Sequence, residues 1–224
     1  MSRFYANIHV RDESREQILE HLFNLRGEPE SMEEEVNVAS LRDAQMLSHA
    51  HSEESRMLLS PSINGWVSIF IEEFIEGDEI AENLSELTDD WTVFLWADPE
   101  QAWGYSIFRA GEESDEFVND LSYYDGTVDE HDEDQLSGNP DLYSELLESP
   151  NTLNDLKNIL ELARHESMKD EEESQERRSE RVANEFRMFS ESLGIPHAAT
   201  DYQYIIQGDQ EDLLRWDEFV HVTF

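Results

Sequence analysis

Negative charge is the feature that most limits what this chain can fold into. Its 224 residues include 54 Asp and Glu against 15 Lys and Arg, which gives a formal net charge of −39 at pH 7. Such a charge destabilises a compact state through self-repulsion and opposes association with other acidic molecules. At molar salt the Debye length falls to roughly 3 Å, and most of this repulsion disappears. The charge therefore indicates a protein adapted to concentrated salt.

The basic residues support the same interpretation. Thirteen of them are Arg, and only Lys157 and Lys169 are Lys. An acidic decoy that imitates DNA needs carboxylates but gives no reason to replace Lys with Arg. An arginine-biased genome in a halophile explains both features, so the sequence favours halophilic adaptation over the decoy.

Several classes of protein are excluded or disfavoured by composition. The chain has no Cys, which removes disulfides and thiolate metal sites. The longest apolar runs, such as Val67–Ile71, are far shorter than the roughly 20 residues of a membrane span. The segment Met1–Val10 alternates in polarity and does not read as a signal peptide. We therefore expect a soluble, cytoplasmic protein that does not bind membranes.

Two strand–helix–strand units are predicted in the first half of the chain, over residues 3–41 and 66–97. Each begins with a strand, in Arg3–Val10 and in Trp66–Phe74, and continues into a segment with apolar residues at helical spacing. Residues 36–41 read as a second short strand of the first unit. Trp103–Arg109 then completes a hairpin with Thr92–Ala97, and residues 116–118 read as a further strand. The pattern predicts an α+β fold, a mostly antiparallel sheet with helices packed on one face.

A helical extension is predicted at the C-terminal end. Residues 125–139 read as a solvated acidic loop. Residues 139–147 and 153–162 read as helices, residues 201–207 as a strand, and residues 166–181 as either a polar helix or a mobile linker. Val182, Phe186, Phe189 and Leu193 form one apolar stripe of a further helix. We therefore expect an α+β domain over 1–125, a connector over 126–181 with an acidic loop and helices, and a C-terminal helix and strand over 182–224 that pack back on the domain.

Two stretches carry a resemblance to other proteins. Gly65-Trp66-Val67-Ser68 opens the first, over residues 65–117, and Leu193-Gly194-Ile195-Pro196 lies in the second, over residues 189–224. Together they resemble a widespread group of uncharacterised cytosolic prokaryotic proteins with no established activity. The resemblance implies no catalytic residues.

The candidate metal site is a pair of histidines followed by acids. His49 and His51 would point to the same side of an extended segment, with Glu53 and Glu54 close behind, as two imidazole ligands of a metal require. On a helix the two histidines diverge by about 200°, and the site fails. A catalytic zinc also needs a third ligand, which the sequence does not identify. We therefore expect surface histidines and no cofactor.

Other candidate side chains are predicted to be core. His9 and His221 lie in apolar strand-like segments. Five large aromatic residues could line a pocket, but their strand spacing is more typical of a core: Trp66, Trp91, Trp96, Trp103 and Tyr105.

Charge is distributed unevenly along the chain. Residues 57–156 hold 26 acidic residues and one basic residue, Arg109. Nucleic-acid binding depends on Lys and Arg that neutralise phosphates, so this region disfavours direct contact with nucleic acid. It would suit a protein partner with a basic surface.

The sequence thus favours a non-enzymatic binding or regulatory protein. A metal-dependent enzyme with a His/carboxylate site and an acidic DNA-mimic decoy are the alternatives.

The net charge generates a prediction about salt. Thermal melts in 0.1 M and 2 M KCl are expected to give a clearly higher melting temperature in 2 M KCl, because salt screens the repulsion among carboxylates. Equal or lower stability in 2 M KCl would rule out halophilic adaptation.

Overall fold

The fold is built around one antiparallel sheet. The computed structural model describes residues 4–27, 29, 31–33, 55–72, 76–124, 130–147, 150–167, 173–202, 205, 215 and 218–224. Within these residues eight strands pair in the order β2-β8-β3-β4-β1-β5-β6-β7. They are β1 (Tyr5–Arg11), β2 (Ser31–Glu33), β3 (Arg56–Leu59), β4 (Trp66–Ile71), β5 (Trp91–Asp98), β6 (Ala102–Arg109), β7 (Glu112–Val118) and β8 (Val220–Thr223). The predicted α+β fold with an antiparallel sheet is confirmed.

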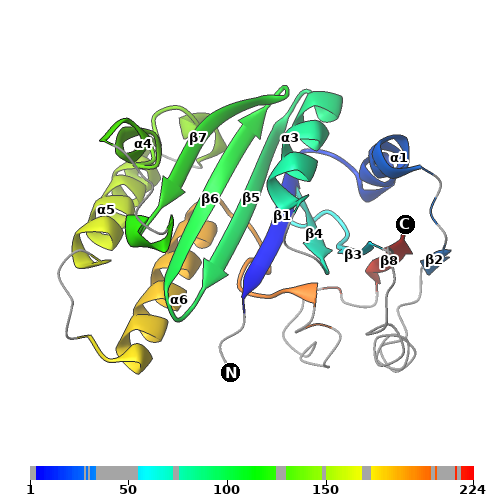
Figure 1. The fold of residues 1–224 in the computed structure, drawn as a ribbon. Helices are drawn as coiled ribbons and strands as arrows, with labels where there is room; N and C mark the ends of the chain where they lie inside the picture. Colours follow the sequence, from blue (N-terminus) through cyan, green and yellow to red (C-terminus); the bar gives the residue numbers. More distant parts are fainter. Residues whose placement is uncertain are drawn as a thin grey trace.

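Helices cover both faces of this sheet. The described helices are α1 (Arg15–Arg26), α3 (Gly77–Thr88), α4 (Glu130–Gln135), α5 (Pro150–Ser167) and α6 (Gln175–Ser192), with short 3-10 turns η2 (Leu121–Tyr124) and η3 (Ser144–Leu146). As predicted for the strand–helix–strand units, α1 and α3 pack on the same face. The C-terminal extension covers the opposite face, where α6 lies behind β5 and β6 in the view of Figure 1.

Alternation along the strands divides the sheet into its two faces. In β1, Ala6, Ile8 and Val10 join the core beneath α1 and α3. Asn7 and His9 point to the other face, because successive side chains of a strand alternate. Asn64 and Gly65 have φ angles of 55° and 79° and form the tight turn that enters β4. The positive φ of both residues explains why Asn-Gly stands at this turn.

The apolar stripe of α6 packs on the aromatic side of the sheet. Val182, Phe186, Phe189 and Leu193 are all at most 2% exposed, as the spacing predicted. The ring of Phe189 stacks on Tyr105 with centroids 4.4 Å apart, and Trp103 lies 5.5 Å from the same ring. The five aromatic residues predicted to be core are all buried.

Several elements differ from the predictions. The predicted helix over 139–147 is wrong, since only the 3-10 turn at Ser144–Leu146 forms there. The acidic loop expected over 125–139 contains α4. Tyr202 and Ile205 are helical, which contradicts a strand over 201–207. β2 and β3 were not predicted, because each is too short to show alternation. The expected strand at 36–41 lies outside the described residues.

Candidate functional site

The predicted histidine site lies outside the described residues. His49, His51, Glu53 and Glu54 all fall in the range 34–54, so that prediction is untested. Within the described ranges no group of three or more His, Asp or Glu is arranged to hold a metal ion. His9 and His221 are 0% and 4% exposed, which confirms that both belong to the interior.

A buried polar cluster on the α6 side of the sheet joins a serine, a histidine and an asparagine. The His9 Nδ1 atom lies 2.9 Å from Ser68 Oγ, and His9 Nε2 lies 2.6 Å from Asn7 Oδ1. All three residues are fully buried. Burial, followed by repulsion from His197, lowers the pKa of His9 to about 3, so the imidazole stays neutral at ordinary pH.

This cluster attaches the segment after α6 to the sheet. The Asn7 side-chain amide donates to the carbonyl oxygens of Ala198 and Thr200, both at 2.8 Å. The residue types are those of nucleophilic catalysis, but a substrate could reach Ser68 only if this segment moved away. In the observed arrangement the polar groups satisfy one another and fix the chain after α6.

A second buried network joins two tyrosines to a carboxylate. The Tyr105 hydroxyl donates to Asp115 Oδ2 at 2.7 Å and lies 2.8 Å from the Tyr143 hydroxyl. The Asn139 backbone N–H also donates to Asp115. Burial raises the pKa of Asp115 to about 6, although these hydrogen bonds act in the opposite direction. The network ties β6 and β7 to the chain that leads into α5.

A third network holds α6 against the sheet through a buried carboxylate. The Trp103 indole N–H donates to Glu185 Oε2 at 2.9 Å. Arg181 bridges Glu185 and Glu173, with N–O distances of 3.3 Å and 3.0 Å. The Arg181 side chain is 12% exposed and the two glutamates are less exposed still. Arg178 lies 3.7 Å from Glu173, so two guanidinium groups face the two carboxylates inside the protein.

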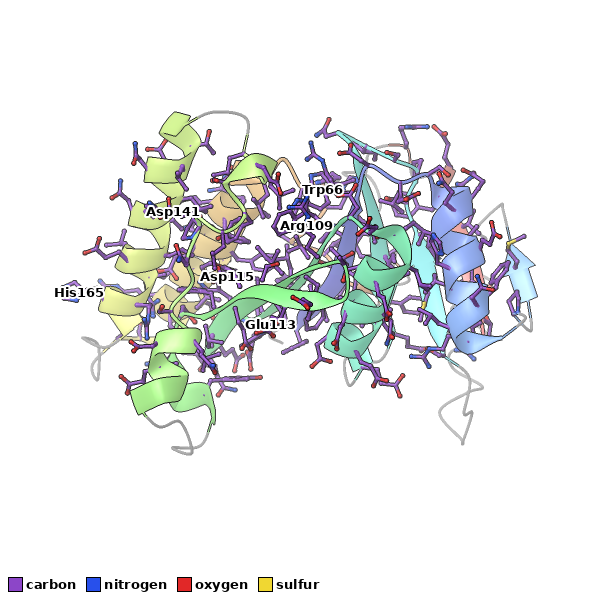
Figure 2. The ribbon with its side chains drawn as sticks, turned by 90° about the horizontal axis from the view of Figure 1, so that it is seen from above. Trp66, Arg109, Glu113, Asp115, Asp141 and His165 are labelled. Carbon is purple, nitrogen blue, oxygen red and sulfur yellow. The ribbon has the colours of Figure 1, made fainter. Side chains whose placement is uncertain are left out.

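The opposite side of the sheet carries a group of carboxylates, which we call the β7–α3 acidic surface: Asp78, Glu82, Glu113 and Glu116. The first two belong to α3 and the others to β7, where Glu113 and Asp115 lie on opposite sides of the strand (Figure 2). Glu116 is half-buried, and the other three residues are exposed. Among the described residues none of the four forms an ion pair with Arg or Lys.

Crowding and burial shift the protonation of this surface. The pKa of Glu116 is raised to about 7, first by burial and then by repulsion from Glu113 and Asp78. Burial, Glu82 and Asp78 likewise raise the pKa of Glu113. Like charges held together in this way destabilise the fold at neutral pH, and a cation bound nearby would relieve the repulsion.

The one basic residue of this acidic region is already neutralised. Arg109 forms an ion pair with Glu145, and its guanidinium lies over the Trp91 ring, 4.8 Å from the centroid. The Trp91 indole N–H donates to the same Glu145 at 3.1 Å. Arg109 therefore does not offset the β7–α3 acidic surface.

The sequence held a signal for one of these groups. Asn7 and His9 are polar residues two apart in an apolar strand, which indicates a polar cluster on one face. Glu113 and Glu116 were missed because β7 was expected only at residues 116–118, whereas the strand begins at Glu112. The carboxylates of α3 and β7 are brought together only by packing.

Comparison with protein-family models, curated proteins and solved structures finds no match to the chain. The resemblance to uncharacterised prokaryotic proteins therefore stays a prediction. None of the helices in the described ranges has the length and apolar character needed to cross a bilayer.

The raised pKa of Glu116 predicts an unusual pH dependence. The folded state holds its proton up to about pH 7 and the unfolded state only to about pH 4.5, so this group costs stability as pH rises through that window. Glu116→Gln is expected to be more stable than the wild type at pH 8 and to lose this advantage near pH 4. Urea unfolding in 2 M KCl measures both. A Glu112→Gln control on the same strand should show no such gain, and an equal gain in the control would contradict the prediction.

Proposed function

We propose that this protein is a non-enzymatic binding protein, adapted to concentrated salt, whose β7–α3 acidic surface receives a partner with a basic surface. The observation that carries the proposal is the group of carboxylates on α3 and β7 without basic neighbours among the described residues. Burial and then neighbouring carboxylates raise the pKa values of Glu113 and Glu116, so part of the cost of ionising these two groups is a repulsion that a partner's Lys or Arg would remove.

The stability that the fold loses by crowding carboxylates on this surface supports a role in binding. The middle region contains 26 acidic residues and a single Arg, and that Arg is held by Glu145 and Trp91. Residues that destabilise the fold yet form a compact surface are typical of functional sites. In concentrated salt the attraction acts over only about 3 Å, so the carboxylates would give specificity at contact more than long-range steering.

The buried serine–histidine–asparagine cluster has a structural role in this proposal. Ser68, His9 and Asn7 are fully buried, and Asn7 uses its amide to hold Ala198 and Thr200. We assign them to the attachment of the chain that follows α6.

Affinity capture from the protein's own cells, in 2 M KCl, tests this function. The wild type is expected to retain a protein in near-equal molar amount with a Lys- or Arg-rich surface. Glu113→Gln/Glu116→Gln should retain less than about a tenth of it, because the neutral side chains lose charge-assisted contacts. Urea unfolding checks that the double variant is at least as stable as the wild type.

The matched control removes two exposed charges from the same elements. Glu86→Gln/Glu112→Gln takes one carboxylate from α3 and one from β7, outside the crowded group. This control should retain the partner. Equal retention by both double variants, or a retained partner without a basic surface, would refute the proposed function.

A further inference from the structure

The outer side of the helix pair α5–α6 carries a groove away from the β7–α3 acidic surface. It has a volume of about 520 Å³ and is lined by seven residues of the two helices: Asp155, Asn158, Ile159, Leu162, Met188, Glu191 and Ser192. We call it the α5–α6 groove. Ile159 is 8% exposed and belongs to the interior beneath the groove.

Two large apolar side chains of the groove are open to solvent. Leu162 is 52% exposed and Met188 is 46% exposed, one from each helix. Concentrated salt strengthens the tendency of apolar groups to leave water, so this exposure is more costly there than in dilute buffer. Methionine also adapts its shape to different partners and recurs at binding surfaces.

The charges of the groove select the kind of partner. Its two charged lining residues, Asp155 and Glu191, are both acidic. Glu191 pairs with Arg187 at 3.2 Å, but its side chain is still 62% exposed. A segment with apolar side chains in the centre and Lys or Arg at the flanks matches this lining. A second copy of the chain would bring the same acidic lining into contact with Asp155 and Glu191, and this contact between like charges disfavours self-association through the groove.

We propose that the α5–α6 groove binds a short amphipathic helix of a basic partner protein. Apolar residues one helical turn apart in the partner would cover Leu162 and Met188, and flanking cations would contact Asp155 and Glu191. The inference rests on the proposed function, since it gives the basic partner a second site of contact on this protein. It adds an apolar source of affinity that salt does not screen.

Fluorescence anisotropy in 2 M KCl tests the groove with a synthetic 16-residue helical peptide, which carries Leu at helical spacing and Lys at both flanks. The Leu162→Ser/Met188→Ser variant is expected to bind this peptide at least tenfold more weakly than the wild type. Leu142→Ser is the matched control, because Leu142 is 53% exposed and lies outside the groove. This control should bind as the wild type does.

Two further peptides separate the apolar and charged contributions. Replacing the flanking Lys by Glu, or the Leu by Ser, is expected to abolish measurable binding to the wild type. Binding of the Glu-flanked peptide as tight as that of the Lys-flanked peptide would overturn the assignment of a basic partner. Sedimentation of the protein without peptide measures its oligomeric state and so tests whether a second copy of the chain occupies the groove. A dimer in the wild type that the groove variant abolishes would assign the groove to a second copy and overturn the proposal.

The acidic-surface variant distinguishes a failure of the groove proposal from a failure of the proposed function. Glu113→Gln/Glu116→Gln should bind the Lys-flanked peptide normally, because these residues lie outside the groove. If the peptide binds the groove variant normally and loses affinity for the acidic-surface variant, the groove proposal is wrong and the proposed function stands. The opposite outcome has two parts: the peptide loses affinity for the groove variant, and both double variants of the capture experiment retain the partner equally. In that case the proposed function fails.

Discussion

The attachment of the C-terminal helices to the aromatic side of the sheet is the contact on which the rest of the structure depends. A buried indole N–H needs an acceptor, and leaving one unpaired costs roughly 1–3 kcal/mol. Trp66 donates to the Leu193 carbonyl at 3.0 Å, and Trp103 donates to Glu185 at 2.9 Å. These acceptors lie at the end and in the middle of α6, so the two bonds fix both its position and its direction.

This attachment determines what each side of the protein exposes. With α6 held inward by its apolar stripe, α5 packs beside it, and the α5–α6 groove forms on the outer side of the pair. On the other side of the sheet, α3 brings Asp78 and Glu82 beside the carboxylates of β7. The proposed partner would therefore meet two surfaces that differ in chemistry, one crowded with carboxylates and one apolar with an acidic edge.

Sequence patterns predicted the regular, well-covered parts of this fold. The strands β1, β4, β5 and β6 and the apolar stripe of α6 stand close to their expected residues, because these strands are rich in aromatic and β-branched residues and the stripe repeats at helical spacing. β3 was missed because its four residues are too few to show a pattern along the chain. The β7–α3 acidic surface and the α5–α6 groove each combine two elements, and their residues are ordinary surface residues when read along the chain.

Unfolding of Phe186→Ala in urea and 2 M KCl tests most directly whether sheet and helices form one cooperative unit. Phe186 is 1% exposed, and its ring lies 6.2 Å from that of Trp103. Emptying a buried aromatic site costs about 3–5 kcal/mol, so the variant should lose that much in a single transition, whereas Met188→Ala at an exposed position should lose little. A loss below about 1 kcal/mol for Phe186→Ala, or a separate early transition, would contradict the attachment of α6 described above.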